Sequence, residues 1–310
     1  MTDTNRPADV GFHPGELTVQ ARAGVAHQAD RLSGMLEPVA LEGGIAEFLA
    51  DRTLLVVTGR DAAGQLWTSP LVGPPGFLRV LSDTRLAVRA TFPKSDPLSG
   101  LAAGQKLGMT AVEFAARRRL RINGTLAVAA GDHLVVEVEQ AYGNCPQYIQ
   151  PRLLAPDHPS PTEPGPIRRG TALTSEDAEL VRTADTFFLG TINPERGADA
   201  SHRGGPPGFV RIDEIGLWWP DYKGNNLFNS LGNLAVDPEA ALLFFDFTTG
   251  RTLQLSGRAQ VEWGQAGRPG DDGHTGRIVR FTPQHVVAGR LLAARQVAHH
   301  PYPRNPALTD

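Results

Sequence analysis

The densest group of residues that could do chemistry lies between positions 217 and 226. Here an apolar stretch runs into a polar turn, in which Tyr222, Lys223, Asn225 and Asn226 supply a hydroxyl, an ammonium and two amides. If a helix follows the turn, its first backbone N–H groups add further donors, and together these donors suit a phosphate dianion. Asp, Gly and Asn also form ordinary strand-to-helix turns, so a purely structural interpretation stays open.

A second group is a basic run made of Arg117, Arg118, Arg119 and Arg121. Guanidinium groups form forked pairs with phosphates and carboxylates, so this run is a candidate for contacts with an anionic ligand or substrate. In a strand these side chains alternate between two faces, and at least one of them is then exposed and structural. Cys145 and Tyr148 follow in an expected turn, where Cys145 is either a reactive thiol or a packed structural cysteine.

An internal repeat indicates which elements position these groups. Residues 73–80, GPPGFLRV, return as residues 205–212, GPPGFVRI, and the run at residues 118–124 returns at residues 251–257. Chance rarely repeats a turn signature and a downstream strand in the same order, so the chain holds two copies of one β-rich domain. Residues 155–170 between the copies carry five prolines, and such a stretch is expected to hold neither a helix nor an internal strand.

The periodicity predicts a mainly β fold with short helices. In the second copy we expect a helix at residues 227–234 and strands at residues 187–192, 208–212, 216–219, 240–247, 252–263 and 277–281. Antiparallel strands in this number close into a barrel, which removes free sheet edges. The expected domains are an N-terminal arm and helix (1–45), a first barrel (46–153), a proline-rich linker (154–173) and a second barrel with a C-terminal tail (174–310).

The two copies differ just upstream of the repeated turn. The second copy has Ser201-His202-Arg203 there, whereas the first has Ser69-Pro70-Leu71. A histidine and an arginine added to one copy of a duplicated unit suggest a catalytic role, with His202 as a proton donor to substrate. The alternative is a histidine that is merely solvated in a loop.

Composition and absent motifs exclude several classes of function. The formal net charge of −3 gives no reason to expect nucleic acid or an anionic membrane as a partner. A single cysteine forms no intrachain disulfide or multi-cysteine zinc site, and no metal site is expected. Neither a signal peptide nor a long apolar span is present, so we expect a cytoplasmic protein. Walker, GxGxxG, HExxH, CxxC and GxSxG motifs are missing, which disfavours Rossmann, P-loop and common zinc chemistry.

A family resemblance joins these patterns. The flavin-binding core of the pyridoxamine 5′-phosphate oxidase-like superfamily resembles residues 208–226, 233–238 and 251–257. The predicted flavin-nucleotide-binding proteins of that superfamily are similar to this chain at FHPGE (12–16), RRRLRING (117–124) and GNCPQYI (143–149). The resemblance implies two tandem split β-barrels, FMN as cofactor and oxidoreductase activity on a small molecule. Such proteins usually form homodimers, although the tandem repeat permits a monomer.

The resemblance also implies roles for individual residues. The flavin would lie along the strands that carry Phe209, Val210 and Arg211, and its phosphate at the turn formed by Pro220, Asp221, Tyr222, Lys223, Asn225 and Asn226. Arg251 and Thr252 would border the cofactor, Thr252 at the position where oxidases of the superfamily commonly place a glutamine. Split barrels bind flavin between two barrels. The first barrel would then reach across the cleft with Arg117, Arg118, Arg119, Arg121, Cys145 and Tyr148, while His202 and Arg203 approach the substrate.

Two rival functions fit the same residues. One is a flavin carrier or sensor without turnover. The other is a split barrel that binds a deazaflavin or heme, because Lys223 is displaced from the Ser-x-Lys pattern of the superfamily and Thr252 replaces the glutamine.

Overall fold

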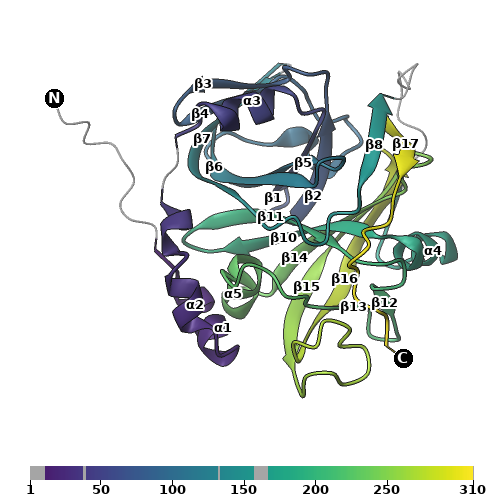
Figure 1. Ribbon diagram of the computed structural model, residues 1–310. Coiled ribbons are helices and arrows are strands. Elements are labelled where there is room, and N and C mark those ends of the chain that lie inside the picture. The colour runs from purple at the N-terminus through teal and green to yellow at the C-terminus, as the bar shows by residue number, and fades with distance from the viewer. Residues whose placement is uncertain (1–10, 38–39, 132, 157–166, 310) are drawn as a thin grey trace.

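Two antiparallel sheets with the same topology dominate the computed structural model, which describes residues 11–37, 40–131, 133–156 and 167–309 (Figure 1). The first sheet contains, in spatial order, β2 (Leu66–Val72), β1 (Leu54–Arg60), β5 (Lys106–Glu113), β6 (Arg118–Ala130), β7 (His133–Gly143), β4 (Arg85–Val88) and β3 (Leu78–Ser82). The second contains β11 (Gly197–Gly204), β10 (Thr186–Asn193), β14 (Glu239–Phe245), β15 (Arg251–Trp263), β16 (Arg277–Arg290), β13 (Leu217–Pro220) and β12 (Arg211–Ile212). The fold is therefore mainly β and duplicated, as the repeat predicted.

Short helices border the sheets, and two of them begin with complete capping boxes. The helical elements are α1 (Pro14–Arg22), α2 (Ala26–Asp30), η1 (Ser33–Leu36), α3 (Gly44–Ala50), η2 (Pro97–Gly100), α4 (Ser175–Thr183) and α5 (Asn229–Val236). His13 caps α1 in partnership with Glu16, and Thr174 caps α4 in partnership with Asp177. These caps satisfy N–H groups that would otherwise lack acceptors.

Each barrel has its own apolar core, and a third cluster joins the two. The joining cluster takes side chains from both barrels, among them Leu54, Val112, Phe114, Phe188, Leu243 and Phe245. The barrels approach so closely that a Cβ on Gly108 of β5 would clash with the backbone of Asp199 on β11. Side chains of β5, β6 and β11 therefore pack directly against one another, and this contact positions the residues that these strands carry.

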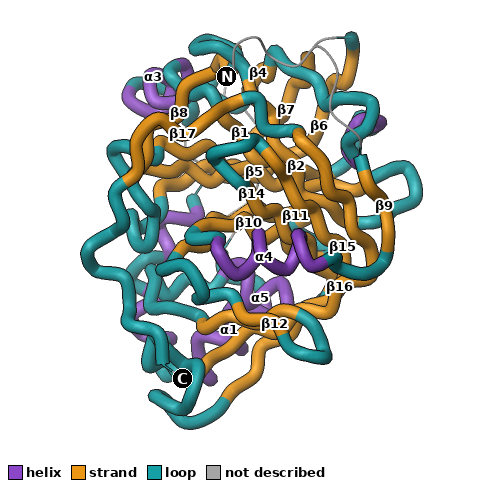
Figure 2. Tube along the Cα trace, turned by 90° about the vertical axis from the view of Figure 1, so that its right-hand side faces the viewer, coloured by secondary structure: helices purple, strands orange, loops and turns teal. Residues whose placement is uncertain are grey.

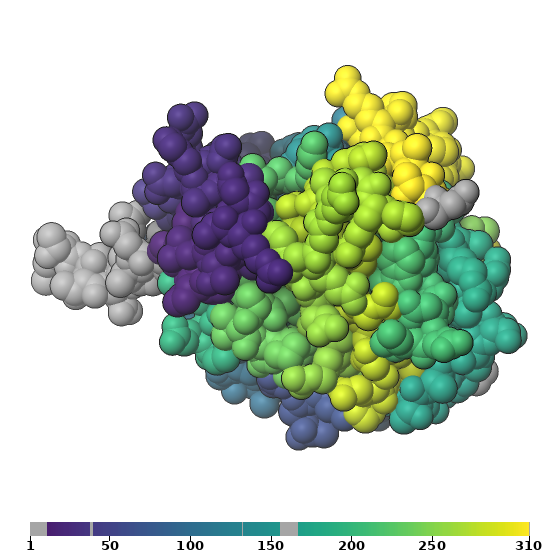
Figure 3. Space-filling view, turned by 90° about the horizontal axis from the view of Figure 1, so that it is seen from below, coloured from purple at the N-terminus to yellow at the C-terminus, as the bar shows by residue number. Residues whose placement is uncertain are grey.

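The N-terminal helices pack against the second barrel. Gly15 of α1 lies against Gly232 of α5, and a Cβ on either glycine would clash with the other helix. Arg22 stacks over the indole of Trp263 at 4.6 Å, and Figure 3 shows the purple N-terminal segment beside the lime-green strand β15. Helix α1 thus holds α5 in place. Residues 1–10 of the expected N-terminal arm lie outside the described residues.

Residues 155–170 contribute to two short strands that were not predicted, and both lie at sheet edges, so they do not contradict the expectation of no internal strand. Strand β8 (Arg152–Pro156) pairs with β17 (Ala294–His299), and β9 (Arg168–Gly170) pairs with β16 (Figure 2). Proline lacks a donor but leaves its neighbours free to pair at an edge, and here those neighbours pair with the C-terminal part of the chain. Residues 157–166 are outside the described part of the chain.

Strand β11 was also missed, so the prediction of a loop around His202 is wrong. Its sequence, GADASHRG, has small and polar residues where a half-buried strand shows apolar alternation. The strand is nevertheless buried almost throughout, because it lies between the two barrels rather than at the surface. Of the other predicted strands of the second copy, residues 208–212 form a strand only at Arg211–Ile212, and the rest are present, with β16 extending well beyond the expected residues 277–281.

Candidate functional site

A cleft of about 90 Å³ opens between the two barrels at the start of α5. The first barrel contributes residues of β6 and of the segment after β7, and the second contributes residues of β11, of the turn after β13 and of the first turn of α5. Predicted site residues that line this cleft are Arg119, Arg121, Cys145, His202, Arg203, Asp221, Tyr222, Asn225 and Asn226. The structure therefore brings the arginine run, the histidine and the polar turn together.

His202 is held rigidly on β11. It is 4% exposed and makes edge-to-face contacts with the rings of Phe114 and Phe188. Burial, reinforced by the charges of Arg119, Arg152 and Arg203, lowers the pKa of His202 well below its usual value, so the imidazole is neutral. Because Nδ1 lies 3.1 Å from Nη1 of Arg119, which can only donate, the ring proton resides on Nε2. Nε2 itself is buried and has no partner among the described residues.

Arg119 fixes that tautomer and is itself fixed by carbonyls. Its Nη1 donates to the carbonyl of His202 at 3.0 Å, and its Nη2 donates to the carbonyl of Gln147 at 3.1 Å. Burial and the neighbouring charges of Arg121 and Arg203 lower the pKa of Arg119 to about 9. Its Nε finds no acceptor in the described part of the chain. A cation without a carboxylate partner, surrounded by other cations, favours an anionic ligand.

Arg121 ties the first barrel to the second. Its Nε lies 3.3 Å from Oδ1 of Asp199 on β11, and its Nη1 donates to the hydroxyl of Tyr142 and to Oδ1 of Asn229 at the start of α5. Burial alone would lower the pKa of Arg121, but Asp199 and Tyr142 more than compensate and raise it. Arg121 is a permanent charge whose position depends on α5.

Asp221 and two arginines make up the opposite wall. Arg203 lies 3.3 Å from Oδ1 of Asp221, and Nε of Arg277 lies 2.8 Å from Oδ2. Burial lowers the pKa of Arg203, and its Nε has no partner within the described ranges. The hydroxyl of Tyr222 is also buried without a partner there, and burial together with Asp272 raises the pKa of Tyr222. This wall therefore presents further donors that no protein acceptor uses.

The turn between β13 and α5 exposes backbone donors to the same cleft. Asn226 and Phe228 adopt positive φ angles of 61° and 58°, a conformation that costs energy for a bulky residue such as Phe228. Phe228 is the N-cap of α5, and no side-chain acceptor caps the helix there among the described residues. The first residues of α5, Asn229 and Ser230, line the cleft. A helix start of this kind, beside unpartnered arginine and tyrosine donors, fits an anion.

A broader groove adjoins the cleft, and Arg119 and Asn144 line both. The groove has a volume of about 660 Å³ and opens beside α3. Its other lining residues include the apolar Ile45, Phe48, Leu120 and Pro146, the basic Arg117 and Arg118, and the acidic Glu42. The cleft and the groove thus share two wall residues, and the groove offers a partly apolar space beside the cationic cleft.

Several predicted cofactor residues lie elsewhere. Phe209 and Val210 are buried in the core of the second barrel, and Pro220 is buried in β13. Arg211 forms a forked pair with Asp272 and also donates to the carbonyl of Thr309. Arg251 pairs with Asp177, and the hydroxyl of Thr252 lies 3.4 Å from the carbonyl of Gly289. The polar side-chain groups of Arg211, Arg251 and Thr252, which were expected to face a cofactor, therefore contact other parts of the protein instead.

The remaining predicted residues flank the cleft or face solvent. Lys223 is exposed and is not among the cleft-lining residues. Arg117 stacks on Tyr302, and Arg118 stacks on Phe48, both within reach of the broader groove. Tyr148 packs against Tyr222 with ring centroids 4.9 Å apart, behind the wall of the cleft.

Sequence patterns missed three polar residues of the cleft region. Asn144 receives a hydrogen bond from Asn225 at 3.1 Å, and Asn229 accepts from Arg121 at 3.2 Å. Ser230 donates to Asp199 and to Ser201. The one available signal was that Asn229 and Ser230 would begin a helix immediately after the polar turn.

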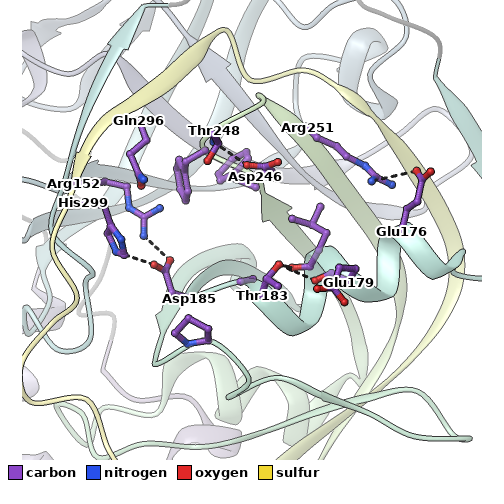
Figure 4. A pocket seen from close by; sticks show the side chains of 15 residues that line it. Arg152, Glu176, Glu179, Thr183, Asp185, Asp246, Thr248, Arg251, Gln296 and His299 are labelled. Carbon is purple, nitrogen blue, oxygen red and sulfur yellow. Dashed lines mark hydrogen bonds and ion pairs between the residues drawn. The ribbon is translucent and has the colours of Figure 1, made fainter.

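A second pocket lies between α4, β8 and β17 (Figure 4). There Asp185 accepts a hydrogen bond from Arg152, and Nε2 of His299 lies 3.0 Å from its other oxygen. Arg152 also stacks over the ring of Phe247 at 4.0 Å. The trio joins the C-terminal strand to the core, and no predicted catalytic residue belongs to it.

Comparison with known families agrees with the fold. Residues 173–269, most of the second barrel, match the model of the pyridoxamine 5′-phosphate oxidase family. Residues 173–269 therefore resemble the pyridoxamine 5′-phosphate oxidase family, and the first sheet repeats the strand order of the sheet that contains them. Among curated proteins, none matches the chain. Within the described residues no helix is long and apolar enough to cross a membrane.

Solved structures show only distant likeness. HutZ, a heme storage protein from Vibrio cholerae, is 15% identical and aligns over 36% of this chain and 90% of its own, with a TM-score of 0.29. An F420 reductase is 14% identical over 42% of this chain and 98% of its own, with a TM-score of 0.26. A putative pyridoxamine 5′-phosphate oxidase from Corynebacterium glutamicum is 14% identical over 41% of this chain and 96% of its own, with a TM-score of 0.27. At such values these structures carry no argument about the ligand.

Proposed function

We propose that the chain binds FMN at the inter-barrel cleft and uses it for redox chemistry on a small molecule. The observation that carries the proposal is the set of buried donors without protein acceptors around the start of α5: Nε of Arg119, Nε of Arg203 and the hydroxyl of Tyr222. Buried polar groups are almost always hydrogen-bonded, so these donors indicate a ligand rich in acceptors. A phosphate supplies such acceptors.

The adjoining groove supports a flavin rather than a bare phosphate. It shares Arg119 and Asn144 with the cleft, and Ile45, Phe48 and Leu120 give it apolar walls for a flat ring. FMN has this combination of a phosphate at one end and an aromatic ring system at the other. A deazaflavin with a phosphate in its side chain has it too, so the spectrum of the bound molecule decides between them.

The chain's own residues would hold and orient the cofactor. FMN, when bound, supplies the hydride or electron transfer. Arg119, Arg203 and the start of α5 would hold its phosphate, and Arg121 would keep α5 in register through Asn229. His202 keeps a proton on Nε2 because it is neutral and accepts from Arg119 at Nδ1. It would therefore donate a hydrogen bond to a bound acceptor without changing charge.

A retained absorbance spectrum tests the proposal. FMN is added to the purified protein, the excess is removed by gel filtration, and the spectrum is recorded. We expect the flavin bands to stay with the protein. A colourless protein would contradict the proposal, and a spectrum typical of heme or of a deazaflavin in the protein as purified would replace FMN with that ligand.

Turnover separates an enzyme from a carrier. The loaded protein is reduced without oxygen, and candidate acceptors are then added. Reoxidation by a small organic acceptor, faster than for free reduced FMN, is the expected result. A reoxidation rate equal to that of free FMN for every acceptor would make the chain a carrier or sensor.

A further inference from the structure

The duplicated fold contains a counterpart of the cleft on the other side of the barrel interface. The spatial order of strands in one sheet matches that in the other position by position, so β2 corresponds to β11 and β6 to β15. The repeated sequences give the residue equivalences: Ser69 corresponds to Ser201, and Gln254 corresponds to Arg121. Contacts across the interface reach equivalent acceptors from non-equivalent donors. Thr110 on β5 donates to the carbonyl of Ala200, and Gln254 on β15 donates to the carbonyl of Thr68, the residue equivalent to Ala200.

The counterpart lacks every cation of the cleft. By the same equivalences, Arg119 and Arg121 are replaced by Thr252 and Gln254, while His202 and Arg203 are replaced by Pro70 and Leu71. Thr252, Gln254 and Leu71 are buried in the structure. These replacements remove the charges that would hold an anion supplied from outside.

The counterpart contains a carboxylate of the chain itself. Oδ1 of Asp96 accepts from the hydroxyl of Ser69 at 2.7 Å and from the backbone N–H of Leu98 at 2.8 Å, and Oδ2 lies 3.3 Å from Nε2 of Gln254. Asp96, Ser69 and Gln254 are each at most 1% exposed. Ser69 and Gln254 are equivalent to Ser201 and Arg121 of the cleft. They therefore have the carboxylate of Asp96, a residue of the chain itself, as their acceptor.

We propose that Asp96 closes this counterpart by placing its carboxylate where the cleft binds the anion of its ligand. The chain consequently binds one phosphate-bearing cofactor, at the cleft of Arg119 and Arg203, although its fold is built for two. The stoichiometry rests on the proposed function, whereas the role of Asp96 does not. A chain that lost the carboxylate would gain a buried site for a small carboxylate anion.

The first test is the stoichiometry of FMN binding to the wild-type chain, measured by titration and by flavin content after gel filtration. One FMN per chain is expected. Two would overturn the closure of the counterpart. If FMN does not bind, the proposed function fails, and the second test below still decides the role of Asp96.

The second test is rescue by formate. Removal of the side chain in Asp96→Ala leaves a cavity with unused donors, so formate should raise the melting temperature of this variant above its value in the same concentration of chloride. Wild type and Asp96→Asn, in which the site stays filled, should show no difference between formate and chloride. Equal responses of all three proteins would overturn the proposal. If Asp96→Ala does not fold, the formate test on Asp96→Gly and the FMN stoichiometry of the wild type together decide the role of Asp96.

Discussion

Nη1 of Arg119 on the first barrel lies 3.1 Å from Nδ1 of His202 on the second barrel. This hydrogen bond crosses the barrel interface and decides which nitrogen of a buried histidine carries the proton. Arginine only donates, so Nδ1 accepts and Nε2 keeps its hydrogen. Because burial and three arginines also lower the pKa of His202, the site holds a neutral hydrogen-bond donor where most histidines would titrate.

We therefore predict that His202 does not titrate near neutral pH. In ¹⁵N-labelled protein its Nε2 signal should be that of a protonated nitrogen, and its Nδ1 signal that of an unprotonated one, unchanged between about pH 6 and 8. In Arg119→Ala the donor to Nδ1 is lost, and the two tautomers should then exchange. A wild-type signal that moves with pH in this range would show that His202 is not isolated as the structure implies.

The positions of the donors predict which substitutions weaken cofactor binding. Arg119→Ala and Arg203→Ala should each weaken FMN affinity at least tenfold, about 1.4 kcal/mol, because each removes a buried cation from the cleft. Lys223→Ala is the matched control. Lys223 is exposed and outside the cleft, so its removal should change affinity less than twofold. Titration followed by flavin fluorescence measures all three, and the reverse ranking would move the phosphate to the exposed side of the turn.

Lys223 also shows what residue patterns can and cannot provide. The repeat correctly predicted a duplicated β fold. Residue types also identified the cleft residues Arg119, His202 and Tyr222. Spacing does not show where a turn residue points, so Lys223 was selected for its charge although its side chain faces solvent. The direction of such a side chain is set by the backbone of its turn.

Strand β11 illustrates a different failure. Its residues 197–204 are small and polar, so no local pattern indicates burial. They are buried because the other barrel covers them, which is a property of the tertiary contact rather than of the segment. The same applies to Asn144 and Asn229, which reach the cleft from segments far apart in the sequence.

Glu16 should make the stability of the protein depend on pH. Burial raises the pKa of this α1 carboxyl to about 7, while hydrogen bonds from His13 and Asn229 oppose the shift. The folded state binds this proton more tightly than the unfolded state, so the contribution is fully present below the unfolded pKa and is lost as pH rises through about 7. Ionisation of Glu16 should therefore lower the melting temperature between about pH 5 and 8, whereas the buried His13 and His202, whose pKa values are lowered, should raise it as pH increases through the unfolded pKa of histidine.

In the variant Glu16→Gln the melting temperature should fall less, or rise more, over the same range than in wild type. The contribution of Asp96, whose pKa burial raises to about 6, should persist in the variant. Glu47→Gln, at an exposed position on α3, serves as the control and should keep the wild-type slope. Identical slopes for all three proteins would mean that Glu16 is ionised in the folded state throughout this range.

The trio of Arg152, Asp185 and His299 should carry much of the attachment of the C-terminal strand (Figure 4). Arg152 is 4% exposed, so Asp185→Asn leaves a buried cation without its carboxylate, at a cost of about 3–5 kcal/mol. Glu176→Gln is the control, because its side chain is 82% exposed and its pairing with Arg251 is worth about 1 kcal/mol at most. Urea denaturation measures the free energy of unfolding of Asp185→Asn and of Glu176→Gln, each relative to wild type. Losses of equal size would show that Asp185 is no more important than a surface ion pair, and that the packing of Arg152 on Phe247 alone holds β8 and β17 in place.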